Sequence, residues 1–341
     1  MLFYAHGDVY KPSSRERLFK LLPLLRERGV DAVVPPLERS VSARTLVKDL
    51  RLLRQADVVF IQKRLMLPHY VSLLRFFRPL VYDFDDAMYA SWPRFEGPPS
   101  TAAVQLSRYR LLAVLKTASV VIAGNPELAE FASRHSRAVR VVPTSVTTYS
   151  TPRQHCNGRT VTIGWIGTDG NLGYLDRMPA ILARLNDALD APVRLRVVCS
   201  RPAPIESPYV DFQPWSLADD EGALSAFDIG IMPLPDNDWT RGKCGFKLLQ
   251  YASAGLPVVA SPVGANRDVV LHGETGFLAE SDGDWVARLA ELATDPRLRQ
   301  RMGEAARERA MCLYSPQAAA DSLAQAIRSA APAGVRTRSS A

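Results

Sequence analysis

Short apolar runs alternate with amphipathic helical stretches along this chain, and no other feature constrains its fold as strongly. In the first half the runs that predict strands are residues 2–5, 32–34, 58–61, 80–83, 119–123 and 139–142. In the second half they are residues 161–166, 193–198, 210–212, 229–231, 258–260 and 276–278. Strands that alternate with helices form a parallel sheet with helices on both faces. The pattern therefore predicts the α/β class, as two doubly wound Rossmann-like domains that face a central cleft.

A polar stretch without periodicity, which contains Pro152 and Gly158, interrupts this alternation and predicts a linker. A last amphipathic helix is expected to pack back on the first domain, and the small, polar residues after it are typical of a disordered tail. In chain order, the predicted parts are a first domain 1–150, a linker 151–159, a second domain 160–314, a returning helix 315–330 and a disordered tail 331–341.

The composition is that of a soluble globular protein in a reducing cytoplasm. Hydrophobic residues make up 47% and charged residues 23% of the 341 residues. No apolar run approaches the roughly 20 residues that span a bilayer. The first residues lack the basic start and long apolar core of a signal peptide. Four scattered cysteines without CxxC spacing argue against a zinc site and against a disulfide framework.

The positive charge of the chain is concentrated in its first half. Residues 1–158 hold 23 Lys and Arg against 13 Asp and Glu, whereas the remainder holds 19 against 22. This half is therefore expected to meet something anionic, such as a membrane surface, a phosphorylated lipid or nucleic acid. The stretch 65–78 interleaves aromatic with basic residues and is a candidate for peripheral membrane contact, although packing on the sheet explains its apolar residues equally well. No motif supports a nucleic-acid partner.

The stretch from Arg241 to Ala260 reads as a loop, a helix, a glycine stop and a buried strand. The helix begins beside Lys243 and Lys247. Free N–H groups and the positive end of the helix dipole would face an anion there, with ammonium groups at its side. The arrangement suits a diphosphate. The alternative is that both lysines are solvated charges on an ordinary crossover helix.

Three blocks of the second half, residues 163–169, 243–260 and 261–278, resemble glycosyltransferase family 4, also called the group 1 glycosyltransferases. The resemblance implies the GT-B fold and transfer of a sugar from a nucleotide-sugar, bound on the second domain, to an acceptor on the first. It also implies retention of anomeric configuration, no required metal, and no cofactor besides the co-substrate. A role in cell-envelope polysaccharide synthesis fits such an enzyme.

Carried over position by position, the resemblance makes Lys247 the catalytic residue that neutralises the leaving diphosphate. Gly167 and Thr168 would offer N–H groups to the phosphates. Gln250 stands in place of a glutamate that holds the ribose, and the other glutamate of the pair is replaced by Gly242. The implied donor-binding residues are Gly167, Thr168, Trp215, Lys243, Gly245, Phe246, Gln250 and Asp268. For Trp215 a core position, and for Asp268 a helix N-terminal carboxylate, are the plain alternatives.

In the first domain, Asp83, Asp85 and Asp86 follow a buried strand. They would bind acceptor hydroxyls, with Asp85 as the catalytic carboxylate. A metal-binding Asp-x-Asp motif and simple turn or cap aspartates remain alternatives. Arg15 and Arg17 would meet an anionic acceptor, with helix capping by Ser14 as the alternative account of this segment. His6 would either point into the cleft or have a structural role.

Two other activities compete with a glycosyltransferase. A nucleotide-sugar epimerase or hydrolase of the same fold would form product without an acceptor. A non-catalytic scaffold that binds nucleotide-sugars would account for the replaced glutamates, Gly242 and Gln250.

Overall fold

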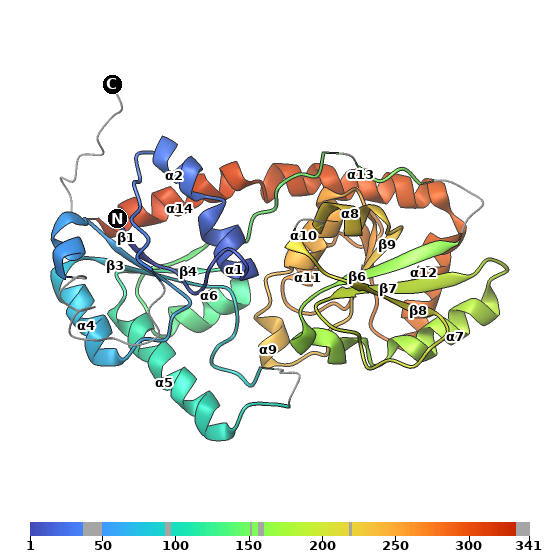
Figure 1. The fold of residues 1–341 in the computed structure, drawn as a ribbon, viewed down its shortest axis with the longest axis horizontal. Coiled ribbons are helices and arrows are strands. Elements are labelled where there is room, and N and C mark those ends of the chain that lie inside the picture. Colours follow the sequence, from blue (N-terminus) through green and yellow to red (C-terminus); the bar gives the residue numbers. More distant parts are fainter. Residues whose placement is uncertain (37–49, 93–96, 151, 156–159, 218–219, 332–341) are drawn as a thin grey trace.

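The computed structural model describes residues 1–36, 50–92, 97–150, 152–155, 160–217 and 220–331. Two parallel sheets lie side by side, each covered by helices on both faces, so the predicted α/β class with two Rossmann-like units is confirmed (Figure 1). Most of the predicted linker and all of the predicted tail except Ala331 fall outside the described residues.

The first sheet has five parallel strands in the order β1-β2-β3-β4-β5. Their bounds are β1 Leu2–Tyr4, β2 Val59–Gln62, β3 Leu80–Phe84, β4 Val120–Ala123 and β5 Val139–Val141. The strand predicted at 32–34 is reduced to one bridge, between Val33 and Leu2. Pro35 and Pro36 follow it directly, and since proline has no N–H to donate, pairing cannot continue.

The second sheet has six parallel strands in the order β11-β10-β9-β6-β7-β8. Their bounds are β6 Val161–Ile166, β7 Val193–Cys199, β8 Val210–Pro214, β9 Ile229–Met232, β10 Val258–Ala260 and β11 Gly276–Leu278. The chain runs outward from β6 to β8 and then returns to the other side of β6 as β9. Ligands of open sheets bind beyond the carboxyl ends of the strands at such a reversal, which places the second domain's site next to β6 and β9.

Several helices begin at a residue whose side chain caps the first turn. Ser100, Asn125, Ser281 and Ser315 each accept a hydrogen bond from a first-turn N–H, which satisfies a donor without an intrahelical partner. The first domain carries α1 Pro12–Ser14, η1 Arg15–Phe19, α2 Leu22–Glu27, α4 Pro68–Phe77, α5 Thr101–Thr117 and α6 Pro126–Ser133. The second carries η2 Asp169–Leu175, α7 Met178–Ala188, α8 Asp220–Ser225, α9 Asp238–Arg241, α10 Phe246–Ser253, α11 Asn266–Val269, α12 Asp282–Thr294 and α13 Pro296–Leu313. Among the described residues, no helix is both long and apolar enough to cross a membrane.

The last helix, α14 Pro316–Ala330, leaves the second domain and packs on the first (Figure 1). Its buried face, which includes Leu323 and Ile327, joins the core cluster that contains Phe3 of β1 and Phe60 of β2. An ion pair of 2.6 Å between Arg28 Nε and Asp321 Oδ1 fastens its outer face to the end of α2. The chain therefore passes between the domains twice.

Candidate active site

A cleft of about 530 Å³ lies between the two domains, at the carboxyl ends of strands from both sheets. From the first domain it is lined by Tyr10, Lys11, Pro12, Ser13, Arg15, Glu16, Asp85, Asp86 and Thr144. From the second it is lined by Ile166, Gly167, Thr168, Asp169, Asn171, Ser200, Trp215, Met232, Lys243, Cys244, Gly245, Phe246, Lys247 and Gln250. Most of the predicted site residues therefore come together in one cavity.

The second domain presents the start of α10 to this cleft, with Lys243 and Lys247 beside it. Gly245 precedes the helix with φ 66°, a left-handed conformation that favours glycine. Neither lysine forms an ion pair with a carboxylate of a described residue. The ammonium groups lie on aromatic faces instead: Lys247 Nζ is 5.1 Å from the Trp165 ring centroid, and Lys243 Nζ is 5.2 Å from that of Trp239.

Burial makes these two positive charges unfavourable. Burial, together with the smaller effect of the neighbouring Lys243 charge, lowers the pKa of Lys247 to about 7. Burial also lowers the pKa of Lys243, and the opposing effect of Asp86 does not cancel it. An anion that entered between the ammonium groups would relieve both costs.

Gly167 lines the cleft, but the expectation that its N–H faces a ligand is wrong. That N–H donates to the Val198 carbonyl at 3.0 Å. The residue has a steric role, because a Cβ at this position would lie 2.4 Å from the Trp165 ring and 2.8 Å from Lys247 Cε. Glycine thus lets the Lys247 side chain pass over the end of β6. Thr168 also lines the cleft, and its Oγ1 accepts from Asn171 Nδ2 at 2.8 Å.

Two further predicted donor residues, Trp215 and Gln250, lie in the cleft wall. Trp215 faces the first domain, with the Arg15 guanidinium carbon 6.0 Å from its ring centroid. The prediction for Asp268 is not supported, since its exposed side chain does not line the cleft. The single turn α11 carries it to the side of α13, where its carbonyl accepts from Arg309 Nη2 at 2.9 Å.

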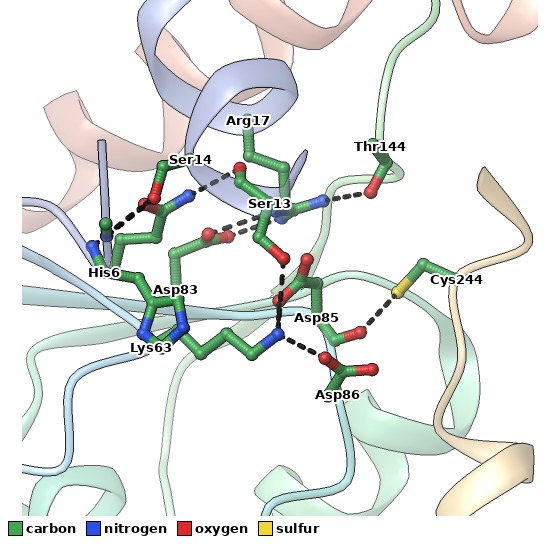
Figure 2. Close-up of polar contacts among 12 residues, drawn as sticks. His6, Ser13, Ser14, Arg17, Lys63, Asp83, Asp85, Asp86, Thr144 and Cys244 are labelled. Carbon is green, nitrogen blue, oxygen red and sulfur yellow. Dashed lines mark hydrogen bonds and ion pairs between the residues drawn. The ribbon is translucent and has the colours of Figure 1, made fainter. Parts of the chain in front are cut away.

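The first domain contributes a compact ionic cluster around Lys63, Asp85 and Asp86 (Figure 2). Lys63 Nζ lies 3.0 Å from Asp85 Oδ1, also contacts Asp86 Oδ2, and donates to Ser13 Oγ at 3.3 Å. Burial disfavours the Asp85 carboxylate, but the charges of Lys63 and Arg17 outweigh it and hold the pKa of Asp85 well below its usual range. Asp85 therefore stays ionised.

Asp83 does not reach the cleft, so its predicted contact with an acceptor is not supported. It belongs to β3, is 2% exposed, and both of its carboxylate oxygens accept hydrogen bonds from Arg17 (Figure 2). Arg17 also donates to the Val142 carbonyl at 2.9 Å and to Thr144 Oγ1 at 3.2 Å. Residues alternate between the two faces of a strand, and Asp83 is directed toward η1. This buried pair connects η1 to β3 and the end of β5.

The same contacts bear on the alternative that Asp83 and Asp85 form a metal-binding Asp-x-Asp motif. Asp83 and Asp85 are paired with different cations, Arg17 and Lys63. Within the part of the chain that the structure describes, no three His, Cys, Asp or Glu side chains are grouped to hold a metal ion.

Arg15 and His6 differ in their relation to the cleft. Arg15 lines it, and its Nε donates to Glu16 Oε1 at 2.9 Å while its Nη1 donates to the Val9 carbonyl at 3.2 Å. His6 follows β1 with an exposed side chain that does not line the cleft. Its backbone N–H donates to Gln62 Oε1 at 3.3 Å.

The loop before α10 is attached directly to the first domain. Asn125 Nδ2 donates to the Lys243 carbonyl at 3.0 Å, and Cys244 Sγ contacts the Asp85 carbonyl at 3.3 Å. Asn125 is 2% exposed and its Oδ1 also caps α6 by accepting from Leu128 N–H. The loop that bears Lys243 thus contacts the loop that bears Asp85.

Comparison with known proteins extends these observations. Residues 160–295 match the family model described as glycosyl transferases group 1. The chain is 43% identical over 68 residues to D-inositol 3-phosphate glycosyltransferase of Kribbella flavida, and 41% identical over 66 residues to N-acetyl-alpha-D-glucosaminyl L-malate synthase of Bacillus anthracis. Each match covers 19% of this chain, and 16% and 17% of those relatives' own lengths.

Solved structures resemble the whole described fold. The structure of Anabaena HepE in complex with UDP and glucose has a TM-score of 0.68 at 14% identity, covering 96% of this chain and 99% of that chain. The apo lipopolysaccharide outer core galactosyltransferase WaaB has a TM-score of 0.68 at 12% identity, covering 96% and 98%. The fold is that of the GT-B proteins, as predicted. The match to the group 1 family model covers residues 160–295, which lie in the second domain.

Proposed function

We propose that this protein is a glycosyltransferase that moves a sugar from a nucleotide-sugar to an acceptor in the cleft. The observation that carries the proposal is a pair of half-buried lysines at the start of α10, Lys243 and Lys247, which form no ion pair with a carboxylate of any described residue. In such a site the N–H groups at the helix N-terminus donate hydrogen bonds to the leaving diphosphate. Both ammonium groups stabilise its negative charge. Transfer would then need no divalent metal.

The remaining donor contacts follow from the positions in the cleft. Gln250 would hold the ribose, because its amide both donates and accepts hydrogen bonds. Trp215 would stack on the base. HepE has been solved with UDP and with UDP-glucose, so a uridine diphosphate sugar is the first donor to test.

On the acceptor side, Asp85 would serve as a fixed negative charge. Because its pKa is held low, it is a weak base. It can accept a hydrogen bond from the acceptor hydroxyl and stabilise the positive charge that develops at the anomeric carbon. Asp86 would bind a second hydroxyl. A weak base suits transfer with retention, in which the leaving phosphate is itself near the incoming hydroxyl.

The proposal is tested by a transfer assay on the purified protein with uridine, guanosine, adenosine and thymidine diphosphate sugars, with and without EDTA. The expected result is transfer with one nucleotide, unaffected by EDTA, and its loss in Asp85→Asn. Nucleotide binding without turnover would favour the scaffold. Release of nucleotide or an altered sugar without any acceptor would favour the hydrolase or epimerase.

We also propose that the first domain approaches an anionic membrane from the cytoplasmic side, where a cell-envelope acceptor would be held. Phe76 on α4 is 83% exposed, Phe77 is 39% exposed, and Arg75 lies beside them with an exposed side chain. Aromatic side chains and Arg suit the interface of an anionic bilayer. Sedimentation with anionic vesicles should fall in Phe76→Ser but not in Val141→Ser, an exposed control in the same domain. Equal sedimentation of both variants would refute membrane contact through α4.

A further inference from the structure

The Lys63 side chain occupies an unusual position for a lysine. Its ammonium lies between two carboxylates, in contact with Asp85 and Asp86, and a third oxygen, Ser13 Oγ, is 3.3 Å away (Figure 2). The carboxylates line the cleft, whereas Lys63 does not. The Lys63 ammonium is thus a positive charge surrounded by oxygen atoms, behind two carboxylates that face the cleft. A divalent cation that binds a pair of Asp side chains has the same surroundings.

The backbone of Lys63 is strained in order to reach this place. Within the described part of the chain it is the one non-glycine residue with positive φ, at 51°. A side chain with a Cβ pays a conformational penalty there, and such strain persists where the surroundings impose it. Lys63 follows β2 directly, and its N–H donates to the Asp83 carbonyl at 2.7 Å on the neighbouring strand. From this position the side chain reaches the carboxylates of Asp85 and Asp86.

The cluster is also well enclosed. Only 10% of the Lys63 side chain and 11% of the Asp85 side chain are exposed. Removing the ammonium would leave two carboxylates close together with little solvent to separate their charges. The lysine therefore balances the negative charge of both carboxylates where they face the cleft.

We propose that Lys63 is the positioning residue of the acceptor side, and that its ammonium takes the place of a divalent cation between Asp85 and Asp86. The expected effect of Lys63 on sugar transfer rests on the proposed function. The structural part of the proposal does not: the two carboxylates form a cation site, and the Lys63 ammonium occupies it.

The direct test does not require activity. Lys63→Met keeps an unbranched side chain that is one atom shorter, and it keeps the backbone strain while it removes the charge. Titration with Mn²⁺, followed by electron paramagnetic resonance, should show about tenfold or more tighter binding of one ion than in the unaltered protein. Lys63→Arg, which keeps the charge, should not gain this site, and neither should the double variant Lys63→Met/Asp86→Asn. Lys63→Met with no gain in Mn²⁺ binding would overturn the proposal.

The second test measures transfer. Lys63→Met should lower kcat by about 10- to 100-fold, the usual cost of losing a group that orients a reacting side chain, while its affinity for the nucleoside diphosphate stays unchanged. Lys63→Arg should recover part of kcat, and Lys116→Met on the exposed face of α5 serves as the control for a lost charge. An unchanged kcat in Lys63→Met would also overturn the role. If the unaltered protein transfers no sugar, the proposed function fails, and the Mn²⁺ titration still decides on the cation site.

Discussion

Gly242 and Ala87 meet across the domain boundary so closely that a Cβ on Gly242 would lie 2.5 Å from the Ala87 Cβ and 2.9 Å from its nitrogen. Gly242 holds the position where the resemblance leads one to expect a glutamate. The packing gives a physical reason for its absence, because any side chain here would push the loop of residues 85–87 away. The glycine thus allows the loop before α10 to contact the loop of residues 85–87.

This contact predicts the effect of restoring the expected residue. Gly242→Glu should reduce kcat, because separating the loops displaces Asp85 relative to Lys243, and small misplacements of reacting groups cost about 100-fold. Nucleoside diphosphate affinity should change less than kcat. Steady-state kinetics and calorimetric titration give the two values, with Gly283→Ala, where no close contact exists, as the control. A Gly242→Glu protein with higher activity would contradict this interpretation.

Replacing Lys247 should lower the activity of the protein without lowering its thermal stability. Lys247→Met should lower kcat by about 100-fold or more, since a charged group that stabilises the leaving diphosphate is lost. The same change should leave the melting temperature equal or raise it, because burial already opposes the lysine charge. Kinetics and thermal denaturation are compared with those of Lys116→Met. An unchanged kcat would remove Lys247 from the mechanism.

The low pKa of Lys247, about 7 in the free protein, predicts proton uptake when the diphosphate binds. Above about pH 8 the free lysine is largely neutral. An adjacent anion raises its pKa, so the complex takes up a proton and affinity falls as the pH rises above about 7. Calorimetry at pH 8 in two buffers of different ionisation enthalpy measures this uptake. Lys247→Met should abolish most of it, and equal heats in both buffers for the unaltered protein would refute the prediction.

Trp239 should matter for diphosphate binding although it does not line the cleft. Its ring lies 5.2 Å from Lys243 Nζ, and a cation–π contact of this kind is worth about 0.5–2 kcal/mol. Trp239→Leu should therefore weaken nucleoside diphosphate binding by roughly 2- to 30-fold, and Trp239→Phe should weaken it less. Binding of the uncharged nucleoside is the internal control. Equal losses for both ligands would mean that the substitution acts through the fold instead.

Much of the fold was predictable because alternation of apolar runs with helices is a local property of the sequence. Lys243, Lys247 and Asp85 were predictable for a similar reason, since each lies in a loop or helix start next to a strand end. Lys63 also follows a buried strand, and that signal could have identified it. Its pairing with Asp85 could not be read from the sequence, because it depends on β2 and β3 being neighbours.

The errors have the same origin. Asp83 and Asp85 are two residues apart and look equivalent in the sequence, yet one belongs to the strand and faces Arg17 while the other follows it and faces the cleft. For Asp268, the single turn of α11 decides the direction of the side chain. Neither outcome follows from residue type or spacing.

The crossing of α14 onto the first domain also sets an order of events during synthesis. Leu323 and Ile327 close one face of the first sheet, so that face stays exposed while the ribosome makes the entire second domain. The second domain, although it is translated later, can therefore complete its fold before the first domain does. A nascent chain released before α14 would present an open apolar surface on its N-terminal half, where chaperones and proteases would engage it.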